Sequence, residues 1–247
     1  MSEEVNHNAT ITRAEEITAI LRDEILTGQY RPGERLPSER ELAARFESNR
    51  GAVRESLKKL EEIGIASIKP GGVRVVPLEE ATLSVLAPML DLQSGQDCSL
   101  FCHTLEVTGA LIGLSARSAV TQATREQLSA MIGCVERMLA SPSDPDLQSD
   151  AWRTLARMLT EINNNLVLRL IMNGLRLQFE SRQKPGGPPL QLDISEQQTI
   201  LSALKDSLAT RNADQVASCI NQHFDLLRTT LEDYYAADPQ NRSQANV

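Results

Sequence analysis

The stretch Leu36–Leu60 reads LPSERELAARFESNRGAVRESLKKL, and it predicts two short helices joined by a tight connection. Ser38 followed by Glu41 is a capping-box pattern, in which the two residues satisfy each other's backbone amides at the start of a helix. Asn49 suits the N-cap of a second helix, along which apolar residues recur every three or four positions. Two capped helices at this spacing predict a helix-turn-helix.

The second predicted helix carries cations along one face, at Arg50, Arg54 and Lys58. Arginines near the N-terminus of a recognition helix pair bidentately with guanine in the major groove. Gly51 and Ala52 lie between the two arginines, and their small side chains would let the helix approach the groove closely. Three cations alone are more typical of an ordinary solvated face. The functional interpretation therefore depends on the segment after this helix.

A predicted β-hairpin comes directly after the helix, as the sequence IASIKPGGVRVVP over residues 65–77. Two β-rich runs flank Gly71 and Gly72, which predicts a Gly-Gly turn with Lys69 beside the tip. A β-ribbon with a glycine tip after a recognition helix is the wing of a winged helix. The tip glycines would allow the backbone to approach a phosphate or a minor groove.

Residues 11–78 together resemble the DNA-binding domain of the GntR family of bacterial transcription regulators. The resemblance rests on ILTGQYRPGERLPSERELAARF, on NRGAVRESLKKLEEIGI and on the glycine wing, after an upstream helix that a Thr12–Glu15 capping box opens. It implies that Arg40 contacts DNA together with the recognition-helix arginines and the wing tip. The full set of predicted DNA-contacting residues is Arg40, Asn49, Arg50, Gly51, Ala52, Arg54, Lys58, Lys69, Gly71 and Gly72.

One departure from the family concerns operator preference. The family usually has a valine-serine pair before the first arginine of the recognition helix and a threonine-proline pair after it. Here those places hold Ser48 and Asn49 before Arg50, and Gly51 and Ala52 after it. The resemblance therefore implies DNA reading, with a sequence preference that differs from that of relatives.

Charge is distributed unevenly along the 247 residues, whose net charge is −8. Residues 30–78 hold ten basic against seven acidic residues, so the net-positive stretch coincides with the helix pair and the wing. Local positive charge is sufficient for DNA binding, because counterion release depends on the contacts made. The polar start of the chain, the absence of a long apolar run and four cysteines confined to the C-terminal part lead us to expect a cytoplasmic protein.

The remainder of the chain predicts helices and no strand of useful length. We expect a mostly α fold, with an N-terminal winged helix-turn-helix and a C-terminal all-α bundle of six or seven helices. The predicted divisions are disordered ends at 1–10 and 239–247, the DNA-binding domain at 11–78, a linker helix at 79–92 and an all-helical domain for effector binding and dimerisation at 93–238.

An all-helical second domain resembles that of the FadR subfamily. Many of its members hold a metal with one aspartate and three histidines, and those places fall here on Trp152, Ala156, Gln197 and His223. One imidazole does not provide the three or four protein ligands that such an ion needs. The resemblance therefore implies no metal and no other cofactor. It is closest to the acyl-CoA-responsive branch, in which a large anionic ligand enters the helical domain.

The candidate effector-binding residues are Glu106, Asn173, Arg176, Gln197 and His223, each of which also has an ordinary structural explanation. The resemblance further implies a homodimer that reads a palindromic operator in double-stranded DNA. Two alternatives stay open, a DNA-binding dimer without an effector and a redox-responsive regulator that uses Cys98 and Cys102. Enzyme chemistry is not indicated, because the sequence has no nucleophile motif and no phosphate-binding loop.

Overall fold

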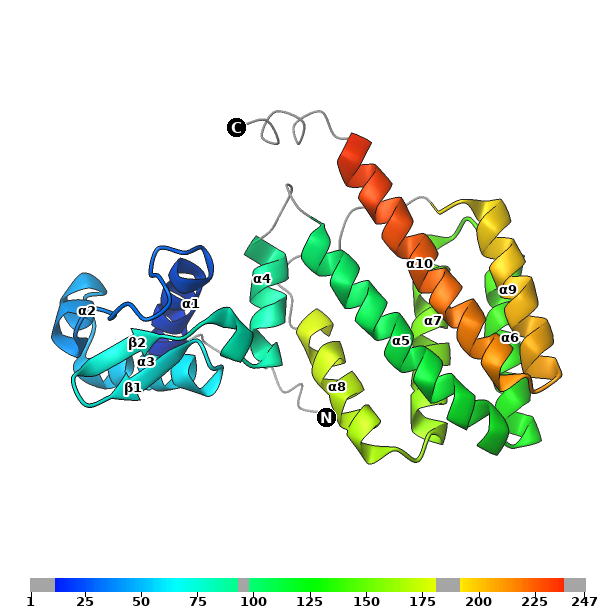
Figure 1. Ribbon diagram of the computed structural model, residues 1–247, viewed down its shortest axis with the longest axis horizontal. Coiled ribbons are helices and arrows are strands. Elements are labelled where there is room, and N and C mark those ends of the chain that lie inside the picture. The colour runs from blue at the N-terminus through cyan, green and yellow to red at the C-terminus, as the bar shows by residue number, and fades with distance from the viewer. Residues whose placement is uncertain (1–11, 93–97, 181–191, 238–247) are drawn as a thin grey trace, which may run out of the picture. The chain divides into compact units, whose positions relative to one another are not determined.

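The computed structural model describes residues 12–92, 98–180 and 192–237, which fall into two compact units, Met1–Leu92 (unit 1) and Gln93–Val247 (unit 2) (Figure 1). The fold is mostly helical, as predicted. The predicted disordered ends lie outside the described residues. The elements of unit 1 are α1 Arg13–Leu26, α2 Glu39–Arg45, α3 Arg50–Glu62, β1 Ala66–Lys69, β2 Gly72–Val75, the 3-10 turns η1 Leu78–Glu80 and η2 Leu83–Val85, and α4 Leu86–Leu92.

The helix starts of unit 1 are fixed by the side chains that the sequence indicated. The Ser38 hydroxyl accepts from the Glu41 amide, and the Glu41 carboxylate accepts from the Ser38 amide, which completes the capping box of α2. The hydroxyl and the amide of Ser38 both donate to the Glu41 carboxylate, and these two hydrogen bonds lower the pKa of Glu41 below its usual value. The same reciprocal arrangement opens α1. Local hydrogen bonds therefore define where these helices begin, independently of tertiary packing.

The core of unit 1 joins its helices to the wing. Residues from α1, α2, α3 and both strands form one buried apolar cluster. Because α3 packs against α1, α2 and β1, the face of α3 that bears the cations is left outward. The largest fully buried side chains in this cluster are Ile17, Leu21, Leu36, Leu42, Leu57, Leu60 and Ile65.

The wing differs from its predicted form by one residue. Strands β1 and β2 are antiparallel, and Lys69 pairs with Gly72, so the two-residue turn is Pro70–Gly71. The predicted Gly-Gly turn at 71–72 is therefore wrong, because Gly72 is the first residue of β2. The segment 34–36 extends the ribbon on its other side, where the Leu36 amide donates to the Val73 carbonyl at 2.9 Å.

The predicted single linker helix at 79–92 is also wrong. The segment forms η1, η2 and the shorter α4, because Ala81 and Thr82 are extended. The amide and hydroxyl of Thr82 donate to the Ile63 carbonyl at 3.0 and 3.1 Å, which ties the linker to the end of α3. Gly64, with φ +83°, packs closely against this segment, because a Cβ there would be 3.1 Å from the Ala81 Cα.

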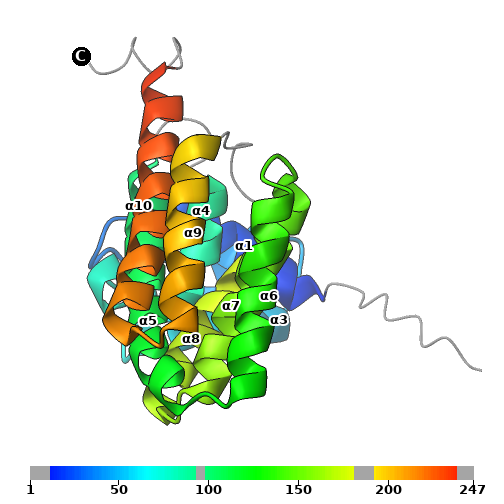
Figure 2. The ribbon, with the colours of Figure 1, turned by 90° about the vertical axis from the view of Figure 1, so that its right-hand side faces the viewer.

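Unit 2 is a bundle of consecutive antiparallel helices (Figures 1 and 2). Helix α10 packs against α5 and α9, while α7 packs against α5 and α6. Gly109 of α5 allows a close crossing, since a Cβ there would lie 2.7 Å from the Phe224 Cβ on α10. The described helices of unit 2 are α5 Ser99–Gln122, α6 Arg125–Ala140, α7 Pro145–Ile162, α8 Leu166–Glu180, α9 Ile194–Ala209 and α10 Ala213–Ala237.

Helix α5 is long and apolar enough to span a membrane by length and composition alone. The helix packs against α7, α8 and α10, and its buried residues include Ile112, Ala116 and Val120 of the bundle core. The core helix of a bundle passes the same test, so we assign the apolar character of α5 to packing.

Candidate nucleic-acid interface and the centre of the helical unit

The start of α3 is built around the Asn49 cap. The Asn49 Oδ1 accepts from the Ala52 amide at 2.9 Å, which places Arg50 at the first helical position with its side chain exposed. A Cβ at residue 51 would lie 3.0 Å from this Oδ1, so Gly51 leaves room for the cap. Ala52 is half-buried and packs against the core of unit 1. The exposed N-terminal turn therefore presents mainly Arg50 and bare backbone.

The cations of unit 1 divide into two groups. Arg45 is structural: it pairs with Glu24 of α1 and contacts the Tyr30 hydroxyl, and the hydrogen bond with Glu24 raises its pKa. A second group makes no ion pair with a carboxylate within the part of unit 1 that the structure describes. Its members come from the loop before α2, from α2 and α3 and from the wing, and they are Arg31, Arg35, Arg40, Arg50, Lys58, Lys69 and Arg74.

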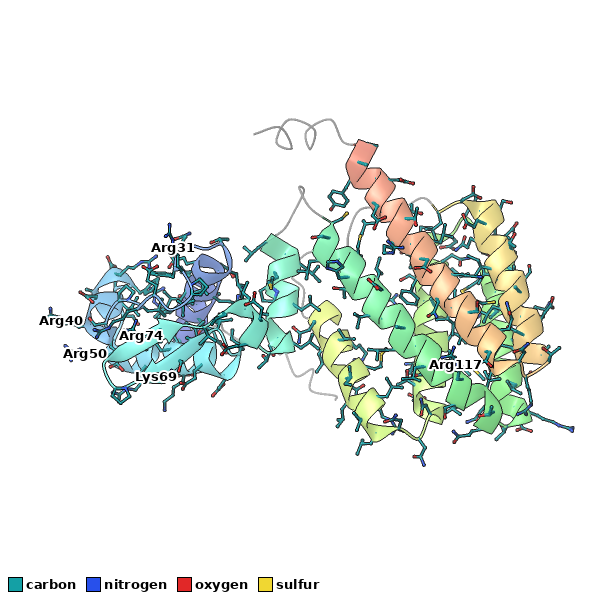
Figure 3. All side chains as sticks on the ribbon, in the orientation of Figure 1. Arg31, Arg40, Arg50, Lys69, Arg74 and Arg117 are labelled. Atoms are coloured by element: carbon teal, nitrogen blue, oxygen red, sulfur yellow. The ribbon has the colours of Figure 1, made fainter. Side chains whose placement is uncertain are left out.

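The N-terminal ends of α2 and α3, which carry Arg40 and Arg50, lie at the same end of unit 1. Figure 3 shows Arg40 and Arg50 projecting from that end, and Lys69 and Arg74 on the wing. All four side chains are exposed. Free positive charges on a recognition helix and an adjacent wing are suited to DNA phosphates and base edges.

Arg54 differs from its neighbours on α3. Its Nε donates to the Glu39 Oε1 at 3.1 Å, and Glu39 is the first residue of α2. The sequence indicated Arg54 as a DNA contact, but gave no sign of this partner. Fifteen residues separate the pair in sequence, and only the packing of α2 against α3 brings them together.

The wing tip has two glycines in different surroundings. Gly71, with φ +103°, has open space where a Cβ would be, whereas a Cβ on Gly72 would lie 2.5 Å from the Arg35 Nε. Arg35 also forms a backbone bridge to Arg74, whose Nη1 donates to the Gly33 carbonyl at 2.9 Å. Sequence reasoning did not assign Arg35. The sequence did offer one signal for Arg35, namely its position in the GERLP segment just after a Pro-Gly turn. This segment pairs with the wing as an edge strand.

At the centre of unit 2 the indole of Trp152 stacks on the imidazole of His223. Their ring centroids are 3.8 Å apart and their planes differ by 12°. His223 is buried, and burial lowers its pKa to about 3, so the imidazole is neutral at neutral pH. The Trp152 Nε1 and the His223 Nδ1 are buried, and neither has a hydrogen-bond partner among the residues that the structure describes.

The residues at this centre do not fit a divalent metal. The indole of Trp152 is stacked and has no lone pair to donate, and the Gln197 Nε2 is bound to the Gln148 Oε1 at 3.1 Å. The Gln148 Nε2 in turn donates to the carbonyls of Met138 in α6 and of Ser141 just after it. In the described part of the chain no group of three His, Cys, Asp or Glu side chains is placed to hold an ion.

The five candidate effector residues lie in two different environments. Gln197 and His223 are buried, whereas Glu106, Asn173 and Arg176 are exposed on α5 and α8. Glu232 raises the pKa of the Arg228 guanidinium on α10, and Asp225 and Glu106 add smaller contributions in the same direction. Gln197 and His223 therefore lie in the bundle interior, whereas the other three candidates lie at its surface.

The thiols of Cys98 and Cys102 lie close together at the start of α5. All four cysteines are free, and Cys102 is buried. Burial, followed by the hydrogen bond with Cys98, raises the pKa of Cys102 to about 12. A thiol with such a pKa has very little thiolate at neutral pH, which lowers its reactivity.

Comparison with known proteins adds two family matches. Residues 13–76 match the sequence model described as bacterial regulatory proteins, gntR family, and residues 103–226 match the FCD domain. The Uxu operon regulator of Haemophilus influenzae is 30% identical over 235 residues, covering 91% of this chain and 82% of its own length. The HTH-type transcriptional regulator Mce2R of Mycobacterium tuberculosis is 29% identical over 168 residues, covering 67% of this chain and 70% of its own.

A solved structure agrees in fold. The structure is described as that of Lar, which controls expression of the Listeria monocytogenes agr system, and it has a TM-score of 0.54 and 17% sequence identity. The alignment covers 90% of this chain and 98% of that one. At this identity the likeness concerns the fold alone.

Proposed function

Because this chain belongs to the gntR family of bacterial regulatory proteins and carries an FCD domain, we propose that its unit 1 reads a palindromic operator as a homodimer and that a small anionic metabolite in unit 2 controls the binding. The protein is a transcriptional regulator that binds DNA through its helix-turn-helix, and it is not an enzyme. We expect it in the cytoplasm, where its DNA is.

The DNA-reading part of the proposal rests on one observation, the cations around α3 that have no carboxylate partner among the described residues. Arg50 stands at the first position of the recognition helix, and Arg40 and Lys69 stand on the neighbouring helix and wing (Figure 3). Arg50 and Arg54 would contact base edges, while Arg40, Lys58 and the wing would position the protein on phosphates. A two-fold dimer would place two such helices on the two half-sites of a palindrome.

The effector part is supported by the polar groups at the centre of unit 2. A buried polar atom without a partner destabilises a protein by roughly 1–3 kcal/mol, so such atoms usually have a partner that is not part of the chain. Within the described part of the chain, Trp152 and His223 each contribute one such atom, and Thr108 of α5 contributes a third. Thr108 precedes Gly109, which packs against Phe224, the residue after His223. An indole N–H, a hydroxyl and a neutral imidazole suit a carboxylate or carbonyl oxygen.

A gel shift with DNA from upstream of the protein's own gene tests both parts. Arg50→Ala and Arg54→Ala are each expected to lose specific binding, by roughly 1–3 kcal/mol, while dimer and fold are kept. Arg117→Ala is the matched control, since Arg117 is an exposed arginine of unit 2 that pairs with Asp214. If specific binding survives in both α3 variants, the assignment of the reading helix is wrong.

The same assay, repeated with long-chain acyl-CoA, separates the effector classes. Release of the specific complex by acyl-CoA, lost on Trp152→Ala, would support a fatty-acid regulator with its site beside His223. A specific complex that acyl-CoA leaves unchanged, but a small carboxylate releases, would support an organic-acid regulator. A complex that neither releases would support the DNA-binding dimer without an effector.

A further inference from the structure

The ion pair between Arg54 and Glu39 sets Arg54 apart from Arg50 and Lys58, the other two cations on the outward face of α3. Its Nε donates to the Glu39 Oε1 at 3.1 Å, and Arg50 and Lys58 on the same helix have no carboxylate partner among the residues described. The Arg54 side chain keeps 67% of its surface exposed, and that of Glu39 keeps 38%. A cation placed to touch DNA is therefore held by a carboxylate on the preceding helix.

Stability does not account for this pair. Exposed ion pairs add little to the stability of a fold, because solvent screens the charges and two long side chains lose conformational freedom. Helices α2 and α3 are already joined through the apolar core, in which Leu42, Val53 and Leu57 are buried. Glu39 also suits the first turn of α2, where a carboxylate is favourable at the helix N-terminus, but that position does not require Arg54.

The geometry of a guanidinium indicates a different role. Arginine has five N–H donors in a planar fork, and Glu39 occupies the one on Nε. The two terminal nitrogens remain available at the exposed end, and they are the donors that reach the O6 and N7 of guanine bidentately. A guanidinium held at Nε has fewer accessible rotamers. It therefore reaches phosphates less readily, and it loses less conformational freedom when it contacts a base.

We propose that Glu39 is a specificity-determining residue, which holds Arg54 in the end-on orientation for guanine and disfavours its use on phosphates. Glu39 acts through Arg54 and is a positioning residue. The inference rests on the proposed function, in which Arg54 contacts a base. The negative charge of Glu39 next to the DNA backbone adds to the effect, since it opposes binding that lacks the guanine contact.

The test uses the full-length protein and a duplex selected by that protein from a random-sequence pool. Fluorescence anisotropy would give Kd for this duplex and for a scrambled duplex of equal length, and the ratio of the two is the specificity. Glu39→Ala should lower the specificity roughly five- to ten-fold. Glu55→Ala is the matched control, because Glu55 is an exposed carboxylate of α3 whose ion pair is with Lys59 and not with Arg54. It should leave the specificity within two-fold.

Two further readouts separate positioning from a general loss of structure. Replacing guanine by 7-deazaguanine at each operator position should weaken the wild-type complex at the base that Arg54 contacts, and this effect should be absent in both Arg54→Ala and Glu39→Ala. The double variant of Glu39 and Arg54 should be no less specific than Arg54→Ala alone. Glu39→Gln keeps the size of the side chain, and it serves the same test if Glu39→Ala fails to fold.

Each contrary outcome identifies the residue assignment that fails. If Arg54→Ala loses specificity and Glu39→Ala keeps it within two-fold, Glu39 has no positioning role, although the proposed function stands. If Glu39→Ala increases specific affinity, Glu39 competes with DNA for Arg54 and the inference is overturned. If Arg54→Ala itself binds the selected duplex as tightly as the wild type does, the assignment of Arg54 fails and the inference fails with it.

Discussion

On α3 and the wing, Arg50 and Lys69 are exposed and have no carboxylate partner among the described residues, whereas at the centre of unit 2 Gln197 and His223 are buried. The first arrangement is stable without DNA because water and counterions satisfy the charges. The second has to satisfy its polar groups from within the bundle or from a ligand. Substitutions on the surface should therefore change binding before stability, and substitutions at the centre should change stability before binding.

The largest expected effect tests the tightness of the bundle. Gly109→Ala places a Cβ 2.7 Å from the Phe224 Cβ, so we expect it to destabilise unit 2 by about 2 kcal/mol. Gly133→Ala is the matched control in α6, because open space surrounds that position. It should stabilise unit 2 by up to about 1 kcal/mol through helix propensity. Trp152 is the sole tryptophan of the chain, so its fluorescence during urea unfolding reports on unit 2.

Equal effects of the two substitutions would contradict the close crossing of α5 and α10. The comparison between the units would also weaken if Gly109→Ala abolished specific DNA binding while unit 2 stayed folded. Substitutions at the surface and in the interior would then not divide into effects on DNA binding and effects on stability, as the burial of their polar groups predicts.

An effect of similar size arises from the buried imidazole. The pKa of His223 is about 3 in the folded protein and near 6.5 when unfolded, so the unfolded state binds the extra proton first as the pH falls. Stability is complete above pH 6.5 and decreases below it, by up to about 1.4 kcal/mol per pH unit for one proton. Urea unfolding followed by circular dichroism between about pH 7.5 and about pH 4.5 would measure this slope.

The control for this slope is a second histidine. His223→Gln should reduce the pH dependence, while His103→Gln should leave it unchanged, because His103 is exposed on α5. A slope that is the same in His223→Gln and the wild type would show that other groups dominate the acid sensitivity of unit 2.

A smaller effect is expected at the wing. Lys69→Ala removes an exposed cation next to the Pro70–Gly71 turn, and it should weaken binding to all duplexes by a similar, few-fold factor. The slope of log Kd against log salt should fall by about one, as expected for one lost phosphate contact. Anisotropy titrations at several salt concentrations would measure it. A loss confined to the operator sequence would instead make Lys69 a base contact.

Local and tertiary features differ in how well the sequence predicts them. The capping boxes and the Asn49 cap are local features, and each was confirmed because it depends on residues within one turn. The linker was mistaken because its geometry depends on the tertiary hydrogen bonds of Thr82 to Ile63.

Functional residues obey the same rule. The cations of α3 were indicated by helical spacing, but Arg35 and Glu39 were missed, because their partners come from other segments of the fold. Helical periodicity predicted the all-α bundle without indicating that Trp152 would stack on His223. That contact depends on how α7 and α10 meet, which a linear pattern does not specify.

The smallest expected effect concerns the cysteines, and it decides between the leading hypothesis and the redox alternative. With its pKa raised to about 12 by burial, Cys102 should be alkylated by iodoacetamide at about pH 8 far more slowly than Cys98, which is partly exposed. Because a redox switch needs a ready thiolate, we expect a mild oxidant such as diamide to change operator affinity less than two-fold. Cys98→Ala should behave as the wild type does. Release of the operator by diamide that is lost in Cys98→Ala would establish the redox alternative, and it would mean that the start of α5 opens enough for Cys102 to react.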